Sequence, residues 1–321
     1  MSQSLLDGDV FQLDYAREIE RISAGLRKAL TGDLGKRGLV VAISGGIDSS
    51  VSASLAVHAL GPAKVFGLLL PERDSSPTSG QRGRSLAEHL GIEYAVEDIS
   101  PALDGLGCYR RRDEVCREVC SEYGDGWKYK IVLTGGLQGR YNHFKLVLQD
   151  LNGRTQEHAL NIKQYLQMVA ATNFKQRVRK TLEYYHADRL NYAVVGTPNR
   201  LEYDQGFFVK NGDGAADVKP IAHLYKTQVY ALARFMGLPA DICNAIPTTD
   251  TYSLSQGQDE FYFGLPYGQM DLALWAYENS RPASELATKL AISEVDALAV
   301  YRDIEAKRRV ARYLHAAPVL C

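Results

Sequence analysis

A five-residue apolar run, residues 39–43, most constrains how this chain can fold, because a glycine turn joins it to a small-residue apolar segment at 49–60. A short run of this kind is typical of a parallel strand buried on both faces. The same alternation continues with an apolar run at 65–70, a helical pattern at 81–90 and a third strand at 92–96. Strands that alternate with helices predict βαβ units, so we expect an α/β fold with a parallel sheet flanked by helices.

Hydrophobic periodicity predicts the remaining elements. Helices are expected at 11–30, 162–185, 225–236 and 282–314, and a further strand at 192–195. Gly196 follows that strand directly, and Ser293 with Asp296 three residues later is a plausible helix start.

The alternation breaks between residues 104 and 158, a charged, glycine-containing segment. Its centre has the pattern of a hairpin, with strands at 129–133 and 144–148 and a turn at Gly135-Gly136. We therefore expect one domain over residues 1–321, with 104–158 as an insertion beside the sheet and helices at 282–314.

Composition limits the class of protein. The 321 residues are 45% hydrophobic and 23% charged with a formal net charge of −1, which favours a globular chain and argues against binding nucleic acid through bulk charge. Neither a signal-peptide pattern in the first ten residues nor a membrane-spanning apolar run is found. Five thinly spread cysteines do not form the pattern of a disulfide framework. We expect a cytoplasmic protein without a membrane or nucleic-acid partner.

The glycine loop, residues 44–50 (Ser-Gly-Gly-Ile-Asp-Ser-Ser), follows the first strand and opens a helix. Adjacent glycines allow a tight turn, and the helix N-terminus offers free N–H groups to an anion such as phosphate. The Asp48 carboxylate beside phosphates requires a cation, for which Mg²⁺ is suited. The loop matches neither the Walker A nor the Rossmann glycine pattern. A purely structural strand–helix connection is the alternative interpretation.

Ser-Gly-Gly-x-Asp-Ser resembles the PP-loop of N-type ATP pyrophosphatases, which adenylate a carbonyl oxygen and release pyrophosphate. Three more segments are similar to NAD synthetases of the ammonia-dependent type: Asn-x-x-x-Arg-x-Arg at 173–179, Gly-Thr-x-Asn-x-x-Glu at 196–202, and nearly all of 206–229. The resemblance implies an adenine nucleotide alpha hydrolase-like (Rossmann-like) fold with ATP and Mg²⁺ as cofactors. It also implies amidation of deamido-NAD by ammonia through an acyl-adenylate, giving NAD, AMP and pyrophosphate, and a homodimer.

The resemblance assigns roles to individual residues. ATP would contact Ser44, Gly45, Gly46, Asp48, Ser49, Ser50, Leu70, Arg177, Thr197, Glu202 and Lys226. Mg²⁺ would be held by Asp48 and Glu202, and the acceptor substrate by Asn173, Arg177, Lys210 and Asp217. Asp48, Lys226, Asp213 and Thr248 are the expected catalytic residues. The alternatives are a solvated loop residue for Glu202, a surface lysine for Lys226 and a turn former for Asp213.

Two segments depart from the family's ordinary pattern: 104–158 and the loop at 247–263, with its aromatic run 261–263. Neither departure changes the residues expected to bind ATP, but both leave the identity of the acceptor carboxylate open. Amidation of another carboxylate, such as a sugar acid or a secondary metabolite, is therefore a rival hypothesis. A tRNA-thiolating enzyme and a non-catalytic nucleotide-binding subunit are further alternatives. No length remains for a glutamine-hydrolysing domain, so the expected nitrogen source is free ammonia or a separate partner.

Overall fold

The computed structural model describes residues 10–134, 143–245, 252–254 and 265–320. A parallel four-stranded sheet with the order β3-β2-β1-β7 forms its centre. The strands are β1 (Leu39–Ala42), β2 (Val65–Leu69), β3 (Glu93–Val96) and β7 (Ala193–Val195). The expected α/β class with a parallel sheet is confirmed.

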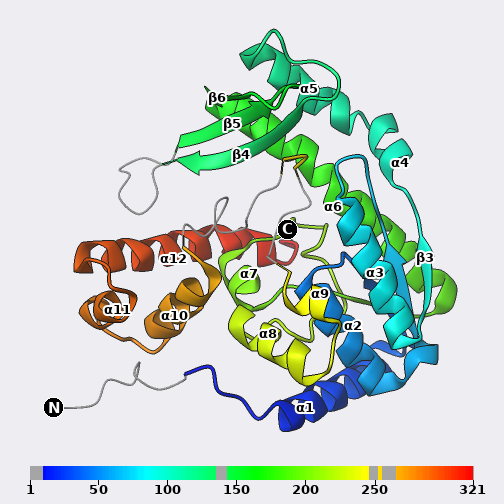
Figure 1. Cartoon of the computed structure of the whole chain (residues 1–321). Helices are drawn as coiled ribbons and strands as arrows, with labels where there is room; N and C mark the ends of the chain where they lie inside the picture. Colours follow the sequence, from blue (N-terminus) through cyan, green and yellow to red (C-terminus); the bar gives the residue numbers. More distant parts are fainter. Residues whose placement is uncertain (1–9, 135–142, 246–251, 255–264, 321) are drawn as a thin grey trace.

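Helices cover both faces of this sheet (Figure 1), because the strands β1, β2 and β7 are apolar and buried on both sides. On one face, Leu39 and Val41 pack with α1 (Tyr15–Lys28), α2 (Ile47–Leu60), α3 (Pro77–Leu90), α8 (Lys226–Phe235) and α9 (Ala240–Cys243). On the other face, Val40 packs with α4 (Ser100–Gly105), α5 (Cys108–Val119) and α6 (Ile162–Leu190). Alternate residues of one strand thus supply both cores.

A second, antiparallel sheet lies beside the N-terminal part of α6, at the top of Figure 1. Its order is β4-β5-β6, with β4 (Lys128–Thr134), β5 (His143–Gln149) and β6 (Thr155–Ala159). Residues 129–133 pair with 144–148 as the sequence predicts, whereas the predicted turn at Gly135-Gly136 lies outside the described residues. The third strand was not predicted, because four of its five residues are polar and give no apolar alternation.

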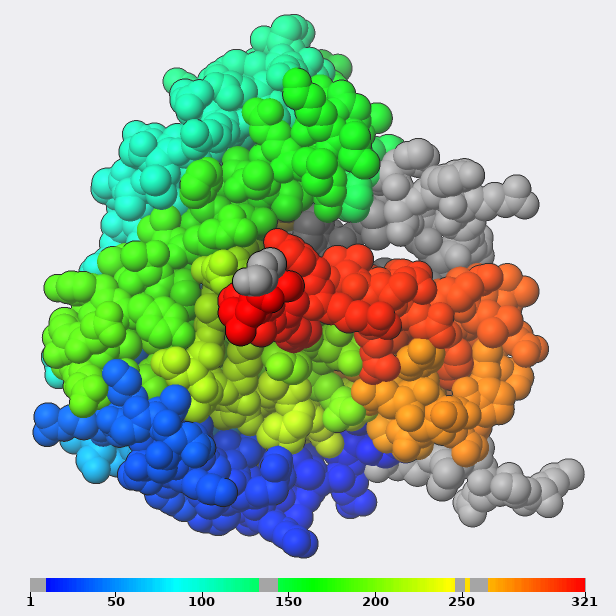
Figure 2. Space-filling view, turned by 180° about the vertical axis from the view of Figure 1, so that it is seen from behind, coloured from blue at the N-terminus to red at the C-terminus, as the bar shows by residue number. Residues whose placement is uncertain are grey.

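The C-terminal helices form a third packing unit, orange to red in Figures 1 and 2. It contains α10 (Tyr267–Glu278), α11 (Ala283–Leu290) and α12 (Glu294–His315), packed on α7 (Arg200–Gln205). The predicted helical stretch 282–314 is two helices, separated by Ala291 in a left-handed conformation, and Ser293 caps the second as predicted.

Element boundaries differ from the sequence prediction by a few residues at most sites. α1 begins at Tyr15, where Asp14 caps it, and continues as a π-helical turn over Ala29–Leu34. A 3₁₀ turn, Pro62–Lys64, precedes β2. Short helices such as α4, α7 and α9 escaped prediction because four to six residues carry too little periodicity.

A buried ion network ties the segment after β2 to α5 and α6. The Lys175 ammonium on α6, 1% exposed, lies 2.9 Å from Glu72 and 2.7 Å from Asp74. Arg112 on α5 reaches the same Asp74 carboxylate at 2.9 Å, and the Tyr109 hydroxyl donates to Glu72 at 2.9 Å. Because each buried charge has an opposite partner, the network fixes the chain that leaves β2 against both helices.

Replacing Lys175 by Met tests this network. The substitution leaves the Glu72 and Asp74 carboxylates buried without that cation, so we expect the free energy of unfolding to fall by about 3 to 5 kcal/mol. Urea unfolding followed by circular dichroism measures the change. Lys163→Met, at an exposed position of the same helix, is the control; equal losses in both variants would contradict the role of the network.

Candidate functional site

The glycine loop lies where β1 ends and α2 begins, and Gly196-Thr197-Pro198 leaves the neighbouring strand β7 at the same edge. From β1 the chain proceeds to β2 on one side, while β7 pairs on the other. This change of direction makes the edge a topological switch point, where open α/β sheets bind ligands.

Hydrogen bonds between its own atoms fix the glycine loop. The Ser44 amide donates to the Ser49 hydroxyl at 3.2 Å, and the Ser49 hydroxyl donates to the Gly46 carbonyl at 3.0 Å. Gly45 has a φ of +78°, and a Cβ added there would lie 2.3 Å from the Ser79 carbonyl oxygen. A side chain at position 45 is therefore excluded both by backbone conformation and by the first turn of α3.

Two carboxylates and one cation gather beside this loop. The buried Lys226 ammonium forms an ion pair with Asp48, and the Asn199 side-chain amide donates to the other Asp48 oxygen at 3.2 Å. Asn199 also caps α7, whose third residue, Glu202, accepts from the Asn199 amide at 3.2 Å. One asparagine thus holds both carboxylates in place.

The electrostatics of the group follow from burial. Loss of water, followed by the nearby Asp48 charge, raises the pKa of Glu202 to about 8. Burial alone would lower the pKa of Lys226, but Asp48 and Glu202 outweigh it and the pKa is raised. The two carboxylates thus repel each other at close range, and one lysine neutralises them in part.

The same pair fits a magnesium ion. No set of three or more His, Cys, Asp or Glu side chains with metal-binding placement occurs in the described parts of the chain. Mg²⁺ commonly takes one or two carboxylates and completes its shell with water and substrate phosphates. Asp48 and Glu202 are such a donor set, next to a loop suited to phosphate.

Lys226 is the first residue of α8, where the sequence predicted a helix start. A side chain of α10 holds this N-terminal end of α8. The buried Asp271 carboxylate accepts hydrogen bonds from the Lys226 amide at 3.3 Å and the Thr227 amide at 2.7 Å. A carboxylate in this position caps the helix N-terminus. The C-terminal helices therefore position the lysine.

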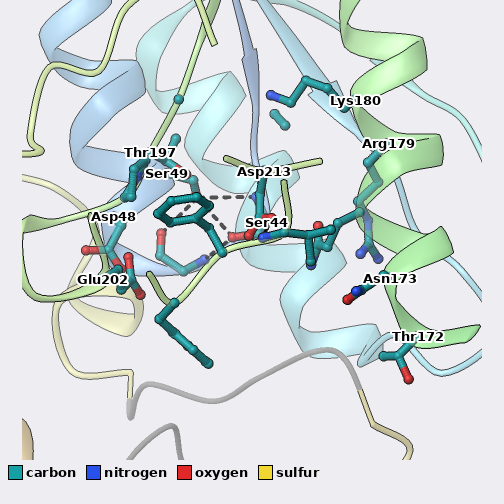
Figure 3. A pocket seen from close by; sticks show the side chains of 18 of the residues that line it. Ser44, Asp48, Ser49, Thr172, Asn173, Arg179, Lys180, Thr197, Glu202 and Asp213 are labelled. Atoms are coloured by element: carbon teal, nitrogen blue, oxygen red, sulfur yellow. Dashed lines mark hydrogen bonds between the residues drawn. The ribbon is translucent and has the colours of Figure 1, made fainter. Parts of the chain in front are cut away.

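The glycine loop, Glu202 and Lys226 line one cavity of about 1040 Å³. Figure 3 shows Asp48, Glu202 and Thr197 on one side of it and Arg179, Asn173 and Thr172 of α6 on the other. α12 contributes a further wall, with Asp303, Lys307 and Tyr313 among its lining residues. The cavity thus connects the strand ends, the long helix and the C-terminal helices.

The two arginines of the 173–179 segment have different partners. Arg177 is exposed and its Nε donates to the Lys210 carbonyl at 3.3 Å, whereas Arg179 donates to the Leu70 carbonyl at 3.1 Å. The Lys210 ammonium donates to the Tyr313 carbonyl at 2.8 Å. Both arginines line the cavity, so α6 faces it along two turns.

Asp213 lies beside a buried ion pair that was not predicted. Its carboxylate accepts from the Val209 amide at 2.7 Å, and burial raises its pKa. Lys180 and Glu183 of α6, 2.6 Å apart, line the same part of the cavity. Sequence reasoning missed this pair because i, i+3 charges on a helix are usually solvated.

The structure brings most of the predicted residues together. The cavity lining includes Ser44, Gly45, Gly46, Asp48, Ser49, Leu70, Asn173, Arg177, Thr197, Glu202, Lys210, Asp213 and Lys226. Ser50 is not in this lining, since its hydroxyl donates to the Gly46 carbonyl within α2. Asp217 is also outside it, because its carboxylate accepts from the Val194 amide of β7 and the Tyr184 hydroxyl. Thr248 and residues 255–263 lie outside the described residues.

A glycine loop at a sheet switch point, with two carboxylates and a buried lysine beside it, defines a nucleotide-phosphate-binding α/β protein. The family model described as NAD synthase matches residues 18–114 and 142–311. The chain belongs to the NAD synthase family.

Individual relatives agree with this assignment. An NH(3)-dependent NAD(+) synthetase of Rhizobium meliloti is 56% identical over 98% of this chain and 95% of its own length. One from Thermotoga maritima is 38% identical over 78% of this chain and 83% of its own. The structure of an NH3-dependent NAD synthetase from Campylobacter jejuni is similar in fold, with a TM-score of 0.63 and 21% identity, covering 97% of this chain and all of that one.

Replacing Gly45 by Ala tests the fit of the glycine loop. The new methyl group requires either the loop or the first turn of α3 to move. Because a displacement of about 1 Å in an active site slows a reaction strongly, we expect ATP turnover to fall at least tenfold. Steady-state AMP release measures this. Gly25→Ala, in α1 with open space around the added Cβ, is the control and should turn over ATP at the native rate.

Proposed function

We propose that this chain catalyses ATP-dependent amidation of deamido-NAD by ammonia, forming NAD, AMP and pyrophosphate. The observation that carries the proposal is the Asp48–Glu202–Lys226 group beside the glycine loop, in a chain that belongs to the NAD synthase family. This group joins phosphate binding to charge neutralisation, as cleavage of ATP between its α and β phosphates requires.

Each residue of the group has a proposed role. The amides and hydroxyls of residues 44–49 bind the phosphates, and Lys226 neutralises the negative charge that grows on the α-phosphate during attack by the acceptor carboxylate. Asp48 and Glu202 would hold Mg²⁺, which lowers the repulsion between the nucleotide phosphates and the incoming carboxylate. The chain itself needs no covalent nucleophile, since it orients reactants and excludes water.

The acceptor side of the cavity is assigned to α6 and the segment after α7. Asn173, Arg177 and Lys210 supply the polar wall across from the glycine loop. We assign to Asp213 the orientation of ammonia and acceptance of its proton, because this carboxyl lines the cavity and burial raises its pKa, which makes it a stronger base than an exposed aspartate. Asp217, held by β7, would act on the acceptor only through the structure around it.

The thiolation alternative is not favoured. Sulfur transfer requires thiolates that react, whereas burial raises the pKa of Cys108 to about 11 and that of Cys116 to about 12. Cys120 and Cys243 are also buried. Thiols of this kind act as small apolar side chains.

The predicted insertion at 104–158, the cytoplasmic location and the homodimer remain proposals. A gap between residues 114 and 142 in the family match supports an insertion there. None of the described helices is long and apolar enough to cross a bilayer. Exposed Ile162 and Leu166 on α6 support a dimer contact at that helix, and sedimentation of the purified protein would measure it.

The first test is a product assay with ATP, Mg²⁺, ammonium and deamido-NAD. We expect NAD, AMP and pyrophosphate in equal amounts, and no NAD after removal of the metal with EDTA, because two carboxylates with one lysine between them would then face the phosphates without a bridging cation. AMP that forms with a different carboxylate and never with deamido-NAD would move the protein to another amidation reaction. ATP–pyrophosphate exchange distinguishes an enzyme from a nucleotide-binding subunit.

Replacing Lys226 by Met should lower kcat by about 100- to 1000-fold, the usual loss for one preorganised charge at a reacting centre. Thermal unfolding in the presence of ATP accompanies the assay, since the substitution also removes the partner of Asp48. Lys289→Met, at an exposed site on α11, is the matched control. A folded Lys226→Met protein with native kcat would contradict the assignment.

A further inference from the structure

Arg82 on α3 lies beside the glycine loop and lines the cavity, although no sequence pattern marks it. The Arg82 Cβ is 3.2 Å from the position that a Cβ on Gly45 would occupy. Ser79, one turn earlier on α3, lies closer still and also lines the cavity. The same face of α3 therefore brings the Ser79 backbone and the Arg82 side chain against the loop that is suited to phosphate.

The other cations in the cavity wall are already engaged. Each has an acceptor within the protein: a backbone carbonyl for three of them and a carboxylate for the other three. They are Arg177, Arg179 and Lys210 in the first group, and Lys180, Lys226 and Lys307 in the second.

Arg82 differs from these six cations. Within the described parts of the chain, the Arg82 Nε is shielded from water and has no hydrogen-bond acceptor. A guanidinium whose buried N–H group lacks an acceptor loses free energy that a bound anion would restore. The neighbouring loop offers amides and hydroxyls, which also favour an anion at this place.

We propose that Arg82 binds the pyrophosphate half of ATP and stabilises it as the leaving group, an inference that rests on the proposed function. During adenylation an acceptor carboxylate oxygen forms a bond to the α-phosphorus. The bond from that phosphorus to the bridging oxygen breaks, and its electron pair leaves with pyrophosphate. Arg82 stays protonated and donates N–H bonds to the oxygens that gain charge.

The position of Arg82 separates this role from acceptor binding. It approaches the loop at Gly45, whereas Asn173 and Arg179 project from α6 on the side away from Asp48 and Glu202 (Figure 3). Lys226 lies at the start of α8, where it pairs with Asp48. Arg82 and Lys226 would thus act on different parts of the triphosphate.

The test compares Arg82→Gln with Arg84→Gln, which changes an exposed arginine of the same helix. Arg82→Gln should lower kcat/KM for ATP by roughly 10- to 100-fold, the loss expected for one charge-assisted interaction. The inhibition constant of pyrophosphate should rise at least tenfold. The inhibition constant of AMP and the KM of deamido-NAD should keep their native values. Arg84→Gln should leave all four values unchanged.

Arg82→Lys separates charge from geometry, because lysine keeps the charge but not the planar pair of donors. We expect intermediate values of both kcat/KM for ATP and pyrophosphate inhibition. A native inhibition constant for pyrophosphate in folded Arg82→Gln or Arg82→Lys protein would overturn the inference. Equal weakening of inhibition by pyrophosphate and by AMP would overturn it as well. Failure of the native protein to make NAD would instead contradict the proposed function, so the two outcomes are distinguishable.

Discussion

The ion pair between Asp48 and Lys226 connects parts of the chain that are 178 residues apart. Asp48 lies in the first turn of α2, directly after the glycine loop, and Lys226 starts α8, whose N-terminus is held by Asp271 of α10. Because both charges are largely removed from water, neither is stable there without the other or an equivalent ion. The glycine loop, Asn199 and the C-terminal helices are all arranged around this contact.

The arrangement explains why a nucleotide site occurs at this edge of the sheet. Parallel strands bring their carboxyl ends to one edge, and the reversal of strand order at β1 leaves an opening between the connections. Small residues in the loop let α3 approach, which is why position 45 tolerates no side chain. The same approach places Arg82 against the loop, and α6 forms the opposite wall of the same cavity.

The antiparallel sheet and α5 contribute to the site through packing. Arg112 and Lys175 share Asp74 in the segment that follows β2, and the Ser75–Ser76 part of this segment lines the cavity. Strand β4 also holds residues 252–254, since the Leu254 amide donates to the Tyr129 carbonyl at 3.0 Å. Phe144 of β5 and Tyr252 themselves line the cavity, so this part of the chain also forms some of its wall.

The sequence alone determined the parallel sheet and the glycine loop with its Asp48, because strand pattern and loop chemistry are local and leave a direct signal. Glu202 and Lys226 were identified through the resemblance to a family, since a lone glutamate or lysine has no local signal of its own. It did not place α10 or β6, whose patterns are ambiguous, nor the pair Lys180–Glu183. Tertiary structure also decided that Asp217 turns to a β7 amide and Arg82 to the glycine loop. Such pairings depend on how distant elements pack, since an arginine in a helix has the same local pattern whether it faces solvent or a phosphate.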